Sequence, residues 1–379
     1  MLKTNLLPAL LLTCFTLHPS ASVQGQWVNI PLPNDHPEVF ALAVHGDSDL
    51  FIGTGGLPDS TTSAIGILWS DNHGASVVPR SHGLKATRFD RLFRSLYSVQ
   101  DLLVAASADG VYFSEDHGKT WTKRSSGLPV VRQTSMKSSN ALVALDGHIF
   151  CGTPAGVYRT RDRGKSWSNS STGLSNPDVR ALATLGDLLF ASTDGDGIYS
   201  SADGGAHWEA SNRGIPPNVR SRAMIASDGT LFAGTTSGTY RSTDRGNSWT
   251  ATLPAANARS FAAGNGLVAL GAFRGSGIVY ISSDHGDRWT DVSANLPRGG
   301  IGVWAMAIDA AYLYAAVNRQ GLWRISLQEL KIQQKSGLVQ QVHPAGGPLT
   351  PAIPDDLLKR ALDVNKDGEI SKAELQNAS

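Results

Sequence analysis

The sequence predicts an all-β fold built from a repeated unit of four short strands. Two observations support it: glycine makes up 40 of the 379 residues, about half as much again as the ~7% average, and one short motif recurs along most of the chain. With 17% charged and 41% hydrophobic residues, the composition excludes disorder over the whole length. The 33 Lys and Arg residues balance 32 Asp and Glu residues, which argues against a general nucleic-acid binder.

The repeated motif is an eight-residue segment that starts with Ser or Thr and ends with Trp. The first clear copy is SEDHGKTW at residues 114–121. It returns as TRDRGKSW (160–167), SADGGAHW (201–208), STDRGNSW (242–249) and SSDHGDRW (282–289), and a degenerate copy, SDNHGASV, begins at Ser70. The shared glycine falls at positions 74, 118, 164, 205, 246 and 286, a mean step of about 42 residues. Such a fixed period is typical of a repeat architecture.

The residues around each motif are predicted to form four short strands. A Gly-led strand precedes the motif, as in GVYFS from Gly110 and GIYSS from Gly197, and an alternating apolar pair lies upstream, as in ALATLGDLLFAST at 181–193. A Trp-led strand follows. Four short antiparallel strands per repeat are typical of a β-propeller blade.

The last blade shows how the ring would close. Residues 304–325 supply three strands with no motif after them, while WVNIPLP, which begins at Trp27, matches the Trp-led strand of the other repeats. Pairing the two would leave no open sheet edge at the seam. We therefore predict a seven-bladed β-propeller of four-stranded blades, closed by the N-terminal strand, over residues 27–326.

The motif resembles the Asp-box of the bacterial neuraminidase-type repeat superfamily, S/T-x-D-x-G-x-T/S-W. Within that superfamily, the blade count and the single propeller are most similar to the photosystem II assembly/stability-factor group and its non-photosynthetic bacterial relatives. Sialidases and xyloglucanase-type glycosidases share the box. The resemblance implies that the box hairpins lie on the face away from the ligand.

The residue types of the box favour a structural role. Its Asp can accept hydrogen bonds from the backbone N–H groups of its own turn, its Gly can adopt a conformation that other residues resist, and its Trp can pack between neighbouring sheets.

An arginine recurs where the first strand of a blade begins. Four blades place Arg94, Arg180, Arg222 and Arg259 there. The other three have Phe40, Asn140 and Trp304, whose two aromatic rings offer either stacking surface or channel packing. The first strands of a propeller line its channel, so the four arginines are expected to point towards one axis at the channel mouth.

Two interpretations of the arginines stay open. A ring of guanidinium groups can bind a carboxylate or phosphate, including that of a protein or peptide partner. Alternatively, each arginine pairs with a nearby acid such as Asp90 or Asp178 and braces a loop. The photosystem assembly group is similar in carrying an arginine patch at its channel mouth, which favours binding.

The N-terminus predicts export. Residues 1–22 combine an early Lys, an apolar run of about 12 residues and small residues before a cleavage site, as in a secretory signal peptide. We expect a secreted or periplasmic protein with no transmembrane segment; lipid anchoring at Cys14 is the alternative. Cys151, in the apolar run HIFCGT, is expected to be a buried, inert thiol.

The C-terminus predicts a calcium site. After a linker at 327–350, residues 351–379 contain a short amphipathic helix and the segment DVNKDGEISKAE, which matches an EF-hand loop. The expected Ca²⁺ ligands are the side chains of Asp363, Asn365, Asp367 and Glu374 with the backbone carbonyl of Glu369. EF-hands usually pair, so a single loop also suggests a dimer contact.

The expected function is non-catalytic binding or assembly, with a glycoside hydrolase as the alternative. The sequence lacks the HExxH and GxSxG motifs and any phosphate-binding Gly loop. A sialidase would need three arginines for the substrate carboxylate, a Tyr nucleophile paired with a Glu, and an Asp acid. A xyloglucanase-like enzyme would need two carboxylates about 5–10 Å apart across the mouth, for which Glu38, Asp90 and Asp178 are the candidates. Sialidases are also six-bladed, and xyloglucanases use two propellers.

Overall fold

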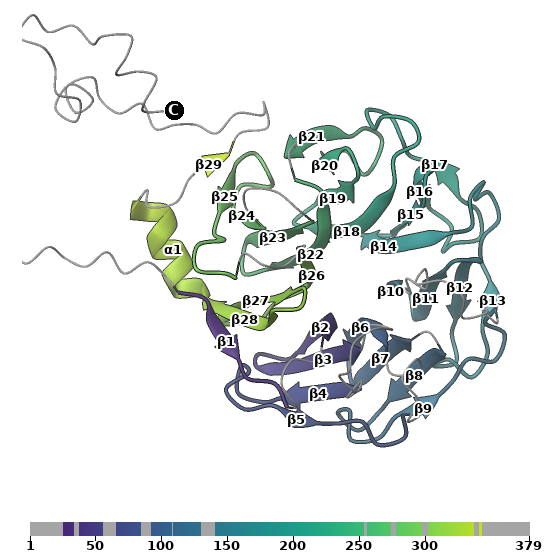
Figure 1. Cartoon of the computed structure of the whole chain (residues 1–379). Helices are drawn as coiled ribbons and strands as arrows, with labels where there is room; N and C mark the ends of the chain where they lie inside the picture. Colours follow the sequence, from purple (N-terminus) through teal and green to yellow (C-terminus); the bar gives the residue numbers. More distant parts are fainter. Residues whose placement is uncertain are drawn as a thin grey trace, which may run out of the picture.

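Seven separate β-sheets are arranged as a ring around a central axis (Figure 1). The computed structural model describes residues 26–33, 38–55, 66–84, 92–107, 109–129, 141–253, 256–273, 278–297, 302–336 and 341–342. Every sheet is antiparallel, and its strands follow one another from the axis outwards, except that one sheet takes its outermost strand from the N-terminal end and another gains a fifth strand from the C-terminal side. The prediction of a seven-bladed propeller is confirmed.

Six blades each contain four consecutive strands, and the seventh contains three strands and the N-terminal strand. Blade 1 contains β2 (Glu38–His45), β3 (Asp49–Gly55), β4 (Ile67–Ser70) and β5 (Val78–Pro79). Blade 2 contains β6 (Phe93–Val99), β7 (Leu102–Ser107), β8 (Gly110–Ser114) and β9 (Thr122–Lys123). Blade 3 contains β10 (Ala141–Leu145), β11 (His148–Thr153), β12 (Gly156–Thr160) and β13 (Ser168–Asn169). Blade 4 contains β14 (Val179–Leu185), β15 (Leu188–Thr193), β16 (Gly197–Ser201) and β17 (Glu209–Ala210).

The remaining three blades complete the ring. Blade 5 contains β18 (Ser221–Ser227), β19 (Thr230–Thr235), β20 (Gly238–Ser242) and β21 (Thr250–Leu253). Blade 6 contains β22 (Ala258–Gly264), β23 (Leu267–Ala272), β24 (Val279–Ser282) and β25 (Trp289–Asp291). Blade 7 contains β26 (Val303–Ile308), β27 (Tyr312–Val317), β28 (Gly321–Ser326) and, outermost, β1 (Val28–Ile30).

The N-terminal strand closes the ring as predicted. β1 lies antiparallel beside β28, with Asn29 opposite Trp323 (Figure 1). Trp27, just before β1, donates its indole N–H to the backbone oxygen of Val292 in blade 6 at 2.7 Å. The first residues of the propeller thus complete its last blade.

The box tryptophans bind each blade to the one before it, and Trp27 does the same at the seam. In each case the indole N–H donates across the blade interface. The acceptors are the backbone oxygens of Arg80 for Trp121 (2.9 Å), Arg124 for Trp167 (3.0 Å), Ser170 for Trp208 (2.7 Å) and Ser211 for Trp249 (2.8 Å), and the Thr252 hydroxyl for Trp289 (2.9 Å). The predicted inter-sheet role of these tryptophans is confirmed.

The apolar core is divided among the blade interfaces. Within the described ranges there are seven clusters of buried apolar side chains, each formed by two neighbouring blades. Cys151 is fully buried in the cluster between blades 2 and 3, and this burial raises the pKa of its thiol to about 12. The expectation of a buried thiol is confirmed.

The box of blade 3 shows how the turn is held. The Thr160 hydroxyl donates to Asp162 Oδ1 at 2.7 Å, and Ser166 donates its backbone N–H to the same oxygen at 2.9 Å and its hydroxyl to Oδ2 at 2.6 Å. These hydrogen bonds, those of Ser166 first, lower the pKa of Asp162 to about 2. Gly164 has φ +81°, and a Cβ there would lie 2.2 Å from the Phe113 ring, so only glycine fits.

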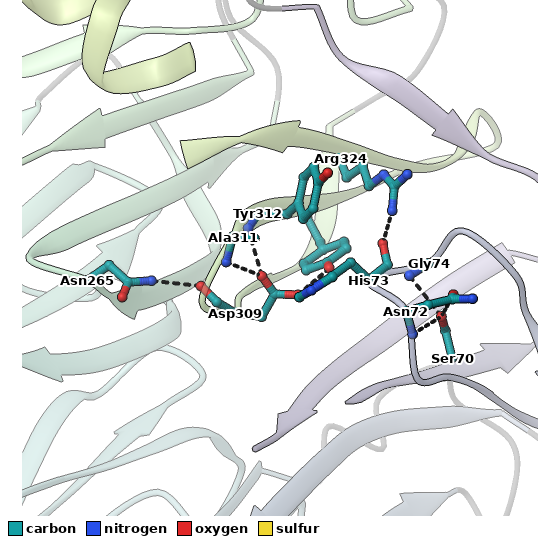
Figure 2. Close-up of polar contacts among 10 residues, drawn as sticks. Ser70, Asn72, His73, Gly74, Asn265, Asp309, Ala311, Tyr312 and Arg324 are labelled. Carbon is teal, nitrogen blue, oxygen red and sulfur yellow. Dashed lines mark hydrogen bonds and ion pairs between the residues drawn. The ribbon is translucent and has the colours of Figure 1, made fainter. Parts of the chain in front are cut away.

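A buried carboxylate joins blade 7 to blade 1 on the box side of the seam. Asp309 lies between β26 and β27, and its side chain is fully buried. Its Oδ1 accepts the backbone N–H groups of Ala311 (2.8 Å) and Tyr312 (2.7 Å), while Oδ2 accepts from the Tyr314 hydroxyl and, at 2.7 Å, from Nδ1 of His73 in the degenerate box (Figure 2). Four donors therefore satisfy the carboxylate, one of them from blade 1.

The surrounding residues extend this contact to blade 6. Asn265 donates to the backbone oxygen of Asp309 at 2.7 Å, and Arg324 of β28 donates to the backbone oxygen of His73 (Figure 2). The Arg324 guanidinium also lies 4.6 Å from the centre of the Tyr312 ring. The seam is held by polar contacts on this face in addition to the β1–β28 ladder.

The chain beyond blade 7 differs from the predicted linker at 327–350. Its first ten residues form helix α1 (Leu327–Ser336). Leu327 and Leu330 are buried in the cluster between blades 6 and 7, and their i, i+3 spacing puts both on one helix face. The two-residue strand β29 (Gln341–Val342) then pairs with β25 as a fifth strand of blade 6.

Candidate functional site: the channel mouth

The innermost strands of six blades share a β-bulge near their start. One residue on each of these strands is skipped in the pairing with the second strand. The skipped residues are Phe40 in β2, Arg94 in β6, Arg180 in β14, Arg222 in β18, Arg259 in β22 and Trp304 in β26. A bulge releases a residue from the regular alternation and re-aims its side chain. The arginine position identified in the sequence is thus a bulge position.

The bulge residues surround one cavity. It has a volume of about 520 Å³, and all six bulge residues line it. Asn140, predicted at the corresponding position of blade 3, lies outside the described residues. Arg220 and Asp194 also line the cavity, as do the small or apolar residues that follow the bulges, such as Ala223 and Met224. The four predicted arginines are therefore brought together.

Arg180 is held by two carboxylates. Its Nη2 lies 2.7 Å from Asp178 Oδ2 and 2.7 Å from Asp194 Oδ2. The other oxygen of Asp194 lies 3.3 Å from Nε of Arg220. Arg180 thus follows the second interpretation, in which an arginine pairs with nearby acids and braces a loop. Sequence reasoning missed Asp194 and Arg220, which a backbone bridge places side by side.

The other three arginines have no such partner among the described residues. Among the described residues, no carboxylate forms an ion pair with Arg94, Arg222 or Arg259. Nε of Arg94 is buried without a hydrogen-bond partner in that part of the chain. Asp90, the predicted brace for Arg94, lies outside the described residues.

Two aromatic rings lie between Arg94 and Arg259. Phe40 and Trp304 pack edge to face, with ring centres 5.0 Å apart. The Arg259 guanidinium lies 3.9 Å from the centre of the Trp304 ring and 5.1 Å from that of Phe273, and the Arg94 guanidinium lies 5.9 Å from the Phe40 ring. These are cation–π distances, so aromatic faces rather than carboxylates accompany these two cations.

The charges at the mouth act on one another. Burial, followed by the charges of Arg222 and Arg94, lowers the pKa of Arg259 to about 10. Burial, followed by the charge of Arg180, lowers the pKa of Arg94. Like charges held together in this way favour an anion among them.

The two described candidate carboxylates for glycoside hydrolysis each lie beside an arginine. Asp178 is bound to Arg180. Glu38 is buried at the start of β2, with Oε1 3.7 Å from Nε of Arg319. Among the described residues that line the cavity, Asp194 is the one carboxylate, and Asp90 is outside the described ranges.

The predicted calcium ligands cannot be placed. Asp363, Asn365, Asp367, Glu369 and Glu374 all lie outside the described residues. Within the described ranges, no cluster of three or more His, Cys, Asp or Glu side chains is arranged to hold a metal ion. The same part of the chain contains no helix with the length and apolar character needed to cross a membrane.

Comparison with known families agrees with the box and the ring. A profile of the BNR/Asp-box repeat matches residues 112–123, and a profile of the DUF6242 β-propeller domain matches residues 205–317. The chain is a β-propeller that contains an Asp-box repeat. No curated protein matches its sequence.

Solved structures with the same fold differ in sequence and function. The extracellular domain of the one-component system BT4673 from B. thetaiotaomicron is 12% identical, with a TM-score of 0.61 over 79% of this chain and 40% of that one. YCF48 bound to D1 peptide is 18% identical, with a TM-score of 0.58 over 79% and 96%. The GH74 xyloglucanase from Xanthomonas campestris is 17% identical, with a TM-score of 0.58 over 80% and 54%. At these identities the likeness shows the fold alone.

Proposed function

We propose that this Asp-box propeller is a non-catalytic binding or assembly protein that recognises an anionic group of a peptide or protein partner at its channel mouth. The observation that carries the proposal is the set of three guanidinium groups, those of Arg94, Arg222 and Arg259, around one cavity without a described carboxylate partner. YCF48 has been solved with a bound peptide, which supports a peptide partner.

Burying cations near one another is unfavourable unless an anion or a stacking partner compensates. Phe40 and Trp304 compensate partly for Arg94 and Arg259, whereas Arg222 has no such contact in the described chain. An incoming carboxylate can accept two parallel N–H bonds from a guanidinium group.

The test compares the binding and the stability of one double variant with those of the wild-type protein. Short acidic peptides with a free carboxyl terminus serve as probes, with Kd measured by calorimetry at low and high salt. Replacing Arg222 and Arg259 together by Ala is expected to weaken binding at least a hundredfold, because each charge-assisted hydrogen bond contributes about 1.5–3 kcal/mol. The Tm should stay the same or rise, since repulsion is relieved.

A matched control separates the site from overall charge. Arg288→Ala removes an exposed arginine in the box of blade 6 and should leave Kd within twofold. Equal losses in Arg288→Ala and in the double variant, or a fall in Tm with unchanged Kd, would contradict the proposal.

The proposal that the protein is non-catalytic is tested by a separate activity assay. Glycoside hydrolysis needs two carboxyl groups on opposite sides of the scissile bond, and Asp194 is engaged by two arginines. We expect no turnover of xyloglucan or of aryl sialosides and glucosides. Turnover that Asp194→Asn or Glu38→Gln abolishes would establish the glycosidase alternative.

We also propose that the C-terminal loop binds Ca²⁺ and that the protein is exported. Position-for-position agreement with the EF-hand pattern from Asp363 to Glu374 supports the first part, and the features of residues 1–22 support the second. Calorimetric Ca²⁺ titration of the full chain should show one site that Glu374→Gln abolishes. Sequencing of the mature N-terminus should place it after residue 21 or 22.

A further inference from the structure

The N-terminal and the C-terminal parts of the described chain dock on one short segment of blade 6, residues 289–292. From the N-terminal side, Trp27 donates its indole N–H to the backbone oxygen of Val292 at 2.7 Å. From the C-terminal side, β29 pairs with residues 289 and 290 of β25. Figure 1 shows α1 and β29 on the side of the ring where the chain enters β1. The strand that closes the ring and the C-terminal segment therefore share a docking site.

The outer edge of blade 6 is covered, whereas the edges of the other blades with a box are open. Thr290, the residue after the box tryptophan, is only 5% exposed. The corresponding residues of the other five blades, with a complete or degenerate box, are all exposed: Val78, Thr122, Ser168, Glu209 and Thr250. An open edge presents unpaired backbone groups to which a further strand can pair. Within the described chain, β29 is the strand that pairs with the edge of blade 6.

Helix α1 anchors the chain before it reaches this edge. The Ser326 hydroxyl accepts the backbone N–H of Gln328 at 3.2 Å and caps the start of the helix. Leu327 and Leu330 are buried in the same apolar cluster as Trp27. Only four residues separate the end of α1 at 336 from the start of β29 at 341. The anchored helix therefore keeps β29 near its edge and lowers the entropic cost of the pairing.

The pairing through β29 is short. The strand contributes two residues, and an edge pairing of this length opens at a low free-energy cost compared with global unfolding. When β29 leaves, residues 289 and 290 lose their outer neighbour, and the backbone oxygen that accepts the Trp27 indole lies two residues further on. Opening of β29 therefore acts on the acceptor that holds the N-terminal strand.

We propose that residues 327–342 form a strap that latches the ring. In the docked state, β29 orders residues 289–292 for the indole of Trp27; in the undocked state, this segment is looser and β1 is released more readily. A partner that captures the chain beyond residue 342 and favours the undocked state would thereby loosen the closing strand. The strap lies at the outer edge of the ring and does not depend on the proposed function of the mouth.

Hydrogen exchange on the full chain tests the strap. Replacing Gln341 and Val342 together by Pro removes both backbone N–H groups of β29. We expect the amides of β25 to exchange at least about tenfold faster and those of β1 about threefold faster, because the docking segment of Trp27 is less ordered. The amides of β14 and β15, on the far side of the ring (Figure 1), should keep their wild-type rates.

The matched control keeps the backbone donors of β29. Replacing Gln341 and Val342 together by Ala changes side chains alone and should leave the exchange of β1 unchanged. Wild-type exchange of β1 in the Pro variant, or equal acceleration in all the blades, would overturn the inference. It would also be overturned if the amides of Gln341 and Val342 in the wild-type protein exchanged as fast as those of an unstructured chain, since the strap would then be undocked.

The coupling between the two docked segments must act in both directions. Trp27→Phe, which loses the hydrogen bond to Val292, should speed the exchange of the β29 amides by a similar factor of about three. When it is combined with the two Pro substitutions, the fall in Tm should be smaller than the sum of the separate falls, because both changes break one coupled contact. Additive falls in Tm, with no effect of Trp27→Phe on β29, would show that the two segments dock independently and would refute the latch.

Discussion

Replacing Asp309 by Ala is expected to weaken the closure of the ring more than any change of an exposed ion pair. The carboxylate accepts from two backbone N–H groups, the Tyr314 hydroxyl and His73, and its side chain is fully buried. Alanine leaves these donors without an acceptor. Each buried donor left without an acceptor costs about 1–3 kcal/mol, so the loss of these hydrogen bonds should amount to at least about 3 kcal/mol, a fall in Tm of roughly 6 °C or more at roughly 2–3 °C per kcal/mol.

Asp187→Ala is the matched control. Asp187 lies in the corresponding turn of blade 4 and pairs with Arg245 in the box of blade 5, but the two side chains are 71% and 58% exposed. Exposed pairs contribute about 0–1 kcal/mol, so this variant should lose no more than about 3 °C. Calorimetry measures both, and hydrogen exchange should show faster opening of β1 and β28 in Asp309→Ala. Equal Tm values for the two variants would refute the reasoning.

Three further changes test other contacts of the scaffold. Trp27→Phe keeps an aromatic side chain but loses the hydrogen bond to Val292, so the free energy of unfolding should fall by about 1 kcal/mol in a denaturant titration. Gly164→Ala should fail to fold or lose several kcal/mol of unfolding free energy. Gly147→Ala is the control, because Gly147 has a similar φ but lies in open space, and it should lose only about 1–2 kcal/mol. Equal losses in the two variants would show that the contact with the Phe113 ring is unimportant. The folded pKa of Asp162 is about 2, below its usual 3.8, so its stabilisation is complete above pH ~4 and is lost as the pH falls towards 2. Asp162→Asn should flatten Tm against pH over that interval.

Much of the fold could be predicted from the sequence because the repeat is read directly from residue spacing. The match between WVNIPLP and the Trp-led strands placed β1 in blade 7, and the indole bond of Trp27 to Val292 is the physical basis of that match. Helix α1 was missed because its sequence, LQELKIQQKS, contains few apolar residues; burial of Leu327 and Leu330 against blades 6 and 7 stabilises it.

The site could be predicted only in part. Aligning the blades located Arg94, Arg180, Arg222 and Arg259, because the bulge falls at the same step of each repeat. The bulge itself is a property of register, which depends on the partner strand and not on one residue. The engagement of Arg180 by Asp194 was missed because it depends on the register of the β14–β15 hairpin, which places Asp194 opposite Asp178 at the start of β14.

The bulges have a consequence for how such a protein can change its ligand over evolutionary time. A residue skipped by the ladder contributes no cross-strand pair, so exchanging it leaves the register of its sheet intact. Phe, Arg and Trp already occupy this position on strands that share the same bulge. Box hairpins and tryptophans maintain the ring on one face, while one bulge side chain from each of six blades lines the cavity on the other. At the proposed binding site, preference can therefore shift through single substitutions, blade by blade, without loss of the fold.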